Sequence, residues 1–598
     1  MKSFSLHHRW QSLMAAFLIP LLAFILACGP GEQPTPTPTP TATPKPAATP
    51  TVTPAAAPVA TATPTRPGPT ATPTPTTVAV ATPTPTPGKQ PKRGGMLRQV
   101  TASFTPNFDI QLLSASPDFY TTNSKMYSNL LLNYTEEVVE CDTCSEWHLE
   151  NNGKTMVFTL IKGIKFHTGQ ELTSADVKYS LRMIIGDVDG IVSPRSGVIK
   201  EYIESIETPD KYTVRINLLR PSPYMSQVLA NGSSVIFRDG TTREGLKTAP
   251  AGSGPFLVDK IVSGSSWTLV RNPNYFKPGQ PYLDKVEVTT IADEATRMAA
   301  FLTGRWDLHI RSSPIAEAFL PSFQKLADQG RINLQPTIGG NHQQGVWMVV
   351  SKPPFDNLKL RQAVNLALDR KRIGSAVFGN LPVHPQLLVY TKDSPWSSRP
   401  ESEIWDVLPG WGTGAKKAQE IEQAKQLVKE AGYPNGIDTE MYGLITAPWP
   451  LGSEESAKQL APVGIRGKLQ ILQSVALAER FTNLTYTMLY YPFAMITRDP
   501  DEIVGQYWIT GAVRNPTGYS NPQVDKLYVQ MSSELDFAKR KQLLRQLEDI
   551  IVLKDVGYAA VQTNDGHAAW WKRVQGVTIG HPHIPAGLMR ADRLWIEE

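Results

Sequence analysis

The chain has 598 residues, 51 prolines, three cysteines and a formal net charge of +5. Residues 30–91 hold 19 of the prolines beside 19 threonines, and such a tract cannot bury an apolar core. The part from Lys92 onward is long enough for large cores, which excludes a fibrous or wholly disordered protein. Four of the five net positive charges precede Lys92, and no basic stripe with interleaved aromatics follows it, which argues against nucleic-acid binding.

The first 28 residues have the pattern of an export signal. Lys2 and Arg9 precede an apolar run over 14–27, which is short for a membrane span and fits the hydrophobic region of a signal peptide. The run ends in Leu26-Ala27-Cys28-Gly29, which resembles a bacterial lipobox, where diacylglycerol alkylates the cysteine thiolate. We expect a lipoprotein signal peptide over 1–28 and a lipid anchor at Cys28. An ordinary secretory signal is the alternative.

Residues 29–91 are predicted to form a disordered linker. Pro-Thr repeats favour extended polyproline II, and at ~3.1 Å per residue the tract could reach at most ~190 Å. The linker is therefore expected to act as a stalk between the membrane and the folded part. Its composition also suits O-glycosylation.

Strand and helix patterns alternate along the rest of the chain. Strands are predicted at 96–98, 155–161, 212–218 and 286–291, and helices at 173–183, 294–302, 358–376, 415–431 and 537–552. A glycine turn at Gly252-Ser253-Gly254 precedes a further strand. The alternation predicts an α/β fold with mixed sheets, and the lack of a long internal linker predicts interwoven lobes.

The two remaining cysteines, Cys141 and Cys144, are spaced Cys-x-x-Cys. Outside the cytoplasm this spacing favours a local disulfide or a pair of free thiols. Zinc would need two more ligands, and only His148 and His167 lie nearby in sequence. A redox motif would need a helix that begins directly after a strand.

No segment carries a recognised catalytic or metal motif. The phosphate-binding loop, the Gly-x-Ser-x-Gly elbow and His-Glu-x-x-His are all missing from the sequence. Asp187-Val188-Asp189-Gly190 begins like a calcium loop but has Val198 where the loop needs a glutamate. His581 and His583 flank a proline, as in a surface turn. We therefore predict no enzymatic activity, no metal and no cofactor.

Several motifs occur together in one order. They are Lys92-Arg93-Gly94-Gly95, 158–169 with 172–177, 360–370, 424–433, Asp499-Pro500-Asp501, 518–525 and Arg540. In combination they resemble the family 5 extracytoplasmic solute-binding proteins of ABC transporters, the class that binds oligopeptides, dipeptides and nickel complexes.

This resemblance implies a two-lobed, periplasmic-binding-protein-like α/β fold of class II type, with an extra subdomain on the first lobe. By analogy the first lobe covers 92–346, with the subdomain at about 125–250. The second lobe covers 347–565, and 566–598 returns to the first. The ligand would be buried between the lobes as they close.

The resemblance and the residue types together point to eight ligand contacts. They are Phe104, Asn107, Trp347, Trp449, Tyr490, Arg498, Asp499 and Trp508. The aromatic members would wall an apolar pocket. Peptide-binding relatives often place an aspartate shortly before the Asp-Pro pair, and this chain has no carboxylate there. Arg498 favours an anionic or carbonyl-bearing ligand, unless it pairs with Asp499 or Asp501.

The predicted function is a monomeric solute receptor, anchored by lipid to the outer face of the cell membrane. It would capture short peptides and deliver them to the permease and ATPase subunits of an importer. Another organic solute or a metal chelate is the alternative ligand. A sensory or adhesive surface protein and an extracytoplasmic hydrolase are the alternative functions.

Overall fold

A computed structural model of the chain describes residues 90–113, 117–134, 138–193, 197–309, 315, 317–338, 342–389, 392, 394–446, 448–495, 497, 499–512, 514–578 and 589–597. These residues belong to one compact unit, Thr74–Glu598. The predicted signal peptide with Cys28, nearly all of the linker, Arg498 and the pair His581 and His583 lie outside the described residues. Within the described ranges, no helix has both the length and the apolarity needed to cross a membrane.

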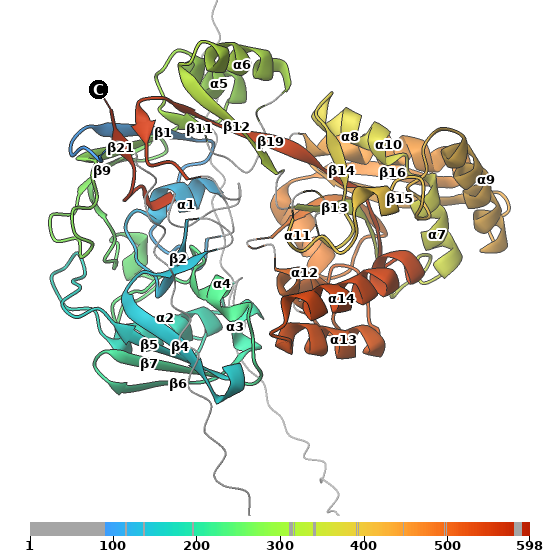
Figure 1. The fold of residues 1–598 in the computed structure, drawn as a ribbon. Coiled ribbons are helices and arrows are strands. Elements are labelled where there is room, and N and C mark those ends of the chain that lie inside the picture. The colour runs from blue at the N-terminus through green and yellow to red at the C-terminus, as the bar shows by residue number, and fades with distance from the viewer. Residues whose placement is uncertain are drawn as a thin grey trace, which may run out of the picture. The chain divides into compact units, whose positions relative to one another are not determined.

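The first lobe begins with a four-stranded mixed sheet in the order β1-β10-β9-β8. β1 (Met96–Thr101) runs parallel to β10 (Lys285–Thr290), and β9 (Ser266–Arg271) and β8 (Phe256–Val262) continue the sheet antiparallel (Figure 1). Burial alternates along β1 and β10, so Leu97 and Val286 enter the core between more accessible neighbours. The strands predicted at 96–98 and 286–291 are confirmed.

The subdomain of this lobe is a second sheet, in the order β4-β5-β7-β6. Its strands are β4 (Cys144–Glu150), β5 (Thr155–Leu160), β7 (Thr213–Leu218) and β6 (Ile203–Asp210). Helix α2 (Ser174–Ile185) buries Val177 and Leu181 in the same core as the strand residue Phe158. As predicted, Thr173 caps α2, and Asp176 Oδ2 accepts the Thr173 amide at 2.7 Å.

A disulfide joins Cys141 and Cys144 at the turn between β3 (Val139–Cys141) and β4. Asp142 lies in this turn and pairs with Arg590 and, at 2.8 Å, with Lys277. Burial alone would raise the pKa of Asp142, but these two cations outweigh it and lower the pKa to about 2. The disulfide turn therefore holds the returning C-terminal segment against the first lobe.

The second lobe is built on a five-stranded sheet in the order β16-β15-β17-β13-β18. The strands are β16 (Ile465–Leu472), β15 (Ile437–Leu444), β17 (Met488–Ala494), β13 (His342–Met348) and β18 (Tyr558–Ala560). Eight helices of this lobe are α7 (Leu358–Ala367), α8 (Arg370–Phe378), α9 (Gly414–Glu430), α10 (Trp449–Leu460), α11 (Ser474–Thr482), α12 (Pro500–Tyr507), α13 (Pro522–Ser533) and α14 (Phe537–Glu548).

The prediction of one continuous helix over 358–376 is wrong, because the chain forms two helices, α7 and α8. Leu368 is extended at the break, and Asp369 caps α8 by accepting the Arg372 amide at 3.1 Å. Arg370, only 1% exposed, donates to the main-chain oxygens of Asn365 and Leu368 at the end of α7. A buried guanidinium thus satisfies carbonyls that a continuous helix would have bonded internally.

Strand β19 (Gln562–Trp571) pairs with strands from both lobes, in a sheet separate from those already described. Its residues 565–571 pair with β12 (Ile332–Ile338), with β11 (Leu308–His309) beside it, and its residues 562–564 pair with β14 (Val383–Pro385). Figure 1 shows β19 running from β12 toward β14. The predicted lobe boundaries at 346/347 and 565/566 therefore fall inside β13 and β19.

The remaining elements are short or lie at the margins of these sheets. They are α1 (Pro117–Asn123), β2 (Leu131–Asn133), α3 (Gly197–Lys200), α4 (Met225–Leu229), α5 (Glu294–Leu302), α6 (Leu320–Asp328), β20 (Val574–Gln575), β21 (Trp595–Ile596) and a π-helical turn at Asp549–Lys554.

The glycine turn before β8 generates the first prediction. A Cβ atom on Gly254 would lie 2.4 Å from the backbone of Met126 and Tyr127. Gly254→Ala should therefore lower the free energy of unfolding by about 2–4 kcal/mol. Chemical denaturation measures this, with Gly245→Ala as the control, since its nearest neighbour is a Thr242 hydroxyl at 3.3 Å. Equal stability of the two variants would contradict the close approach.

Candidate functional site

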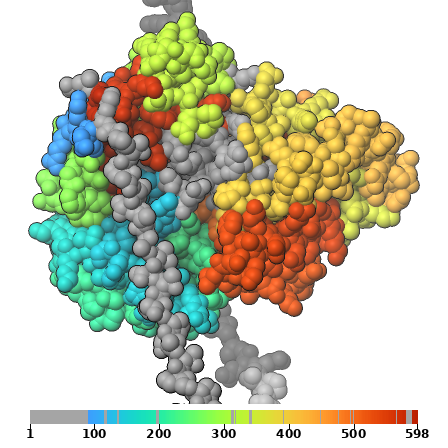
Figure 2. Space-filling view, viewed as in Figure 1, coloured from blue at the N-terminus to red at the C-terminus, as the bar shows by residue number. Residues whose placement is uncertain are grey.

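Side chains of the first lobe contact the second lobe directly at Tyr202. Its hydroxyl lies 2.7 Å from the Tyr528 hydroxyl and donates to Asp501 Oδ2 at 3.2 Å. The Arg220 guanidinium lies over both tyrosine rings, 4.6 Å and 5.8 Å from their centroids, and donates to Ser532 at 3.1 Å. Figure 2 shows teal residues of the subdomain adjoining the orange-red residues of α13 and α14. The two lobes thus share a polar contact that is buried at Tyr202.

Asp499 organises the side of this contact that belongs to the second lobe. It caps α12 by accepting the Asp501 amide at 3.0 Å, and it binds the Arg540 guanidinium through both oxygens at 2.9 Å and 2.7 Å. Arg540 also lies 3.1 Å from Asp501. One buried guanidinium therefore serves two buried carboxylates.

The environment of Asp501, which combines burial with an excess of negative charge, shifts its pKa. Burial is the main cause that raises its pKa, and the neighbouring Asp499 carboxylate raises it further. Arg540 and the Tyr202 hydroxyl oppose the rise only in part, so the pKa reaches about 7. Asp501 therefore titrates near neutral pH.

Two of the predicted aromatic residues of the second lobe, Trp347 and Trp508, form one cluster of rings with Tyr558. The ring centroid of Trp347 lies 5.5 Å from that of Trp508 and 4.6 Å from that of Tyr558, and the last two lie 5.2 Å apart. The Trp347 Nε1 donates to the Tyr491 carbonyl at 3.0 Å. Trp347, Trp508 and Tyr490 have no exposed surface. In this structure these three rings are core residues of the second lobe.

The other predicted contacts are spread over both lobes. Trp449 is half-buried at the start of α10 and meets Phe378 edge-on at 6.1 Å. Phe104 packs on Trp267 at 5.8 Å, and Asn107 Oδ1 accepts the Asp109 amide at 2.9 Å, both in the loop after β1. Arg498 lies outside the described residues. The role of all eight as ligand contacts stays a prediction.

Sequence reasoning missed the residues that join the lobes. Tyr202 and Arg220 occur in segments with no distinguishing motif, and their partners Tyr528 and Ser532 lie more than 300 residues further along the chain. The sequence identified Arg540 only as part of a family motif. The structure shows its contact, a bidentate hydrogen-bonded pair with Asp499.

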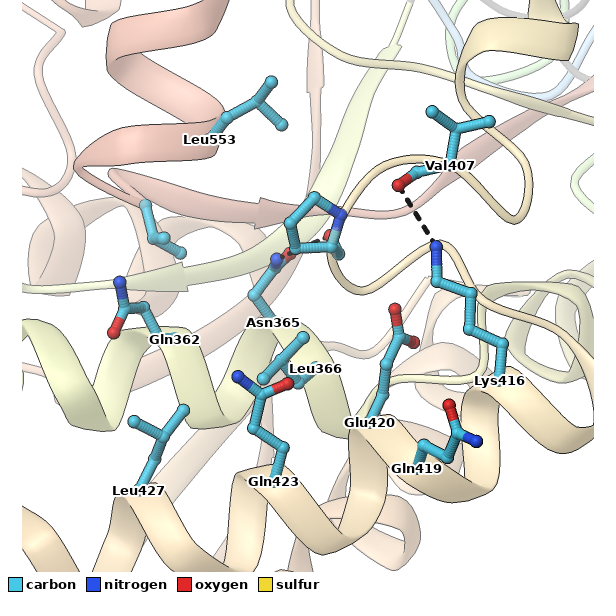
Figure 3. Close-up of a pocket in the computed structure, with 12 residues that line it drawn as sticks. Gln362, Asn365, Leu366, Val407, Lys416, Gln419, Glu420, Gln423, Leu427 and Leu553 are labelled. Carbon is cyan, nitrogen blue, oxygen red and sulfur yellow. Dashed lines mark hydrogen bonds between the residues drawn. The ribbon is translucent and has the colours of Figure 1, made fainter.

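A separate cavity of ≈ 440 Å³ lies between α7 and α9 (Figure 3). Its buried polar groups are already engaged. Glu420 accepts the Gly410 amide at 2.8 Å, Asn365 donates to the Pro409 carbonyl at 3.0 Å, and Lys416 donates to the Val407 carbonyl at 3.1 Å. None of the seven predicted ligand contacts that the structure describes lines this cavity. Among the described residues, no group of three His, Cys, Asp or Glu is placed to hold a metal ion.

The family model for bacterial extracellular solute-binding proteins, family 5, matches residues 139–515. Heme-binding protein A of Haemophilus influenzae is 24% identical over 503 residues, which cover 76% of this chain and 85% of that protein.

Two solved structures share the fold. The binding protein AgaA of A. tumefaciens R10, in complex with agropinic acid, has a TM-score of 0.72 at 22% identity and covers 84% of this chain and 99% of its own. DppA of Helicobacter pylori, in complex with the peptide STSA, has a TM-score of 0.71 at 21% identity and covers 85% and 99%. The predicted two-lobed α/β fold is confirmed.

The Asp501 environment generates a prediction about pH. The pKa of Asp501 in the folded protein is raised above the unfolded value of 3.8. The contribution of its protonated carboxyl to the free energy of unfolding is therefore complete at low pH and is lost as pH rises through about 7. The wild type should therefore lose at least about 1 kcal/mol relative to Asp501→Asn between pH 5 and pH 8. Urea denaturation across this range measures the difference, with the exposed Asp259→Asn as control. A difference independent of pH would show that Asp501 stays ionised in the folded protein.

Proposed function

Because the chain belongs to the bacterial extracellular solute-binding proteins of family 5, we propose that it is a receptor for short peptides, which it delivers to the permease of an ABC importer. Members of the family bind a solute outside the cytoplasm and pass it to the permease and ATPase subunits. In this proposal the protein makes and breaks no bond of the solute.

The contact of Tyr202 with Tyr528 and Asp501 is the observation that supports a mechanism of lobe closure. It joins the two lobes through hydrogen bonds at 2.7 Å and 3.2 Å. Binding proteins of this architecture enclose the solute as the lobes come together. Contacts made only in the closed form lower its free energy, so they increase the apparent affinity for a solute that binds this form.

Short peptides are the proposed solute class because DppA of H. pylori shares the fold with a bound peptide. This chain has no carboxylate at 495–498, where peptide-binding relatives often place the partner of the ligand ammonium. We therefore propose that recognition relies on uncharged hydrogen-bonding groups and on apolar contacts, with Arg498 available for a carbonyl or carboxylate of the solute.

We further propose that the receptor is a monomer anchored to the outer face of the cell membrane through Cys28. The lipobox-like Leu26-Ala27-Cys28-Gly29 and the Pro/Thr tract after it support this arrangement. Acyl chains contribute ~0.8 kcal/mol per buried CH₂, so two or three chains anchor a protein stably. The tract would let the receptor reach solute and permease from one attachment point.

The solute class is tested by thermal unfolding of the full chain. We expect short peptides at 100 times their dissociation constant to stabilise the protein by ~2.7 kcal/mol. Haem, disaccharides and metal chelates serve as comparison solutes and should leave the unfolding temperature unchanged. Stabilisation by one of these classes and by no peptide would reject the peptide assignment, and no stabilisation by any class would reject the receptor function.

The anchor is tested by Cys28→Ala. The wild type should fractionate with membranes and incorporate labelled fatty acid, because the Cys28 thiol is the only predicted acceptor. The variant should incorporate no label and should no longer be retained on the membrane. Cys141→Ala serves as a control that changes a cysteine outside the lipobox. Labelling of Cys28→Ala at the wild-type level would rule out this anchor.

A further inference from the structure

Three uncharged polar side chains are buried without a complete set of partners where the strands of the two lobes cross. They are Gln343 on β13, Gln386 directly after β14 and Thr563 on β19, and each is 0% exposed. Figure 1 shows β14 beside β19 at the place where β19 leaves β12. A strand shared by both lobes is where a hinge lies, so these side chains are placed at the base of the predicted cleft.

Gln386 is the member with the most unused hydrogen-bonding capacity. Neither its side-chain nitrogen nor its side-chain oxygen has a partner. The Oε1 of Gln343 and the hydroxyl of Thr563 are also unpartnered. The Nε2 of Gln343 is engaged, since it lies 2.8 Å from the Tyr558 hydroxyl and 3.4 Å from the carbonyls of Leu387 and Leu388.

Strand register brings the three residues together. Thr563 pairs with His384, so Gln386, two residues further on, emerges on the same face of the β14–β19 ladder as Thr563. The Gln343 amide reaches the carbonyl of Leu387, the residue next to Gln386. The unused donors and acceptors therefore come from β13, β19 and the residue directly after β14, where these segments adjoin.

Such groups destabilise a folded protein unless something else satisfies them. A buried polar atom without a partner costs about 1–3 kcal/mol, and native proteins contain few of them. Four such atoms within one cluster point to a ligand as the partner. The Glu548 carboxylate accepts the Leu388 amide at 3.3 Å and the Ser398 hydroxyl, so its oxygens are already engaged.

We propose that Gln386, Gln343 and Thr563 form the hydrogen-bonding floor of the solute site and bind a peptide group of the solute. A carboxamide offers a donor and an acceptor side by side, as a peptide group does, so Gln386 can exchange two hydrogen bonds with one amide of the solute. The Gln343 oxygen accepts a further N–H, and the Thr563 hydroxyl donates to a carbonyl. This proposal rests on the peptide-receptor function and specifies which residues hydrogen-bond to the peptide backbone.

The uncharged character of this floor also accounts for how a receptor can bind peptides without a carboxylate at 495–498. Backbone amides are common to all peptides, whereas a fixed charge selects one terminus or side chain. Recognition by amide and hydroxyl groups therefore predicts broad acceptance of peptide sequences. It also predicts discrimination against solutes without amides.

The test uses the full chain and two variants, Gln386→Met and Thr563→Val, which keep side-chain volume and remove the unpartnered atoms. The probe is a synthetic library of alanine-based tri- to pentapeptides with one varied position. Peptides that remain with the wild type after gel filtration are identified by mass spectrometry, and calorimetry then measures their affinity for each protein. Gln423→Met, a substitution of an exposed glutamine on α9, is the matched control.

We expect each variant to bind the retained peptides about 10 to 100 times more weakly than the wild type, and Gln423→Met to bind them equally. The ligand-free unfolding temperature of both variants should be unchanged or higher, because an unpaired buried polar group has been removed. This second readout separates a ligand contact from a structural hydrogen bond, whose loss would lower the unfolding temperature.

Each contrary result has a distinct meaning. If both variants bind the retained peptides with an affinity within twofold of that of the wild type, the proposed hydrogen-bonding floor is contradicted and the peptide-receptor function stays intact. A lower unfolding temperature in Gln386→Met and in Thr563→Val would assign both side chains to structure and would also overturn it. A wild type that retains no peptide would overturn the proposed function, and the floor with it.

Discussion

The main-chain hydrogen bonding of β19 is the constraint on which the arrangement of the two lobes depends. Every buried N–H and C=O of a strand needs a partner, and β19 finds its partners in both lobes, β12 and β11 at one end and β14 at the other. The lobes are thereby joined through one sheet strand, so a bend within or beside it moves one lobe against the other. The buried amides and the hydroxyl of the proposed floor lie at this shared strand.

Several buried carboxylates around this frame are paired with cations. Arg540 holds Asp499 through two hydrogen bonds, and Arg590 and Lys277 hold Asp142. The pKa of Asp501 is raised, first by burial and then by the neighbouring Asp499 carboxylate, with which Asp501 shares Arg540. The Asp501 carboxylate accepts the Tyr202 hydroxyl of the other lobe. The protonation of one residue is thereby connected to the contact between the lobes.

Much of the secondary structure could be read from the sequence because it depends on local patterns. Alternation revealed β5 and β7, and the Thr173–Asp176 capping box marked the start of α2. The break between α7 and α8 could not be read in this way, since the carbonyls it frees are bonded by Arg370, whose position depends on tertiary packing. For the same reason the burial of Trp347, Trp508 and Tyr490 inside the second lobe could not be read from the sequence, and their role as ligand contacts stays a prediction.

The sequence by itself determined the family and the class of fold, because motifs carry that information locally, and its composition predicts the export signal and the linker. Only the tertiary structure decided that Cys141 and Cys144 are joined, that Asp499 faces Arg540, and that Tyr202 meets Tyr528. It also decided that the Gln343 oxygen, the Gln386 amide and the Thr563 hydroxyl are buried without partners, although more than 170 residues separate Gln386 from Thr563. Hydrogen bonds between residues far apart in the chain leave no local signal, because they arise only when folding has brought their strands into register.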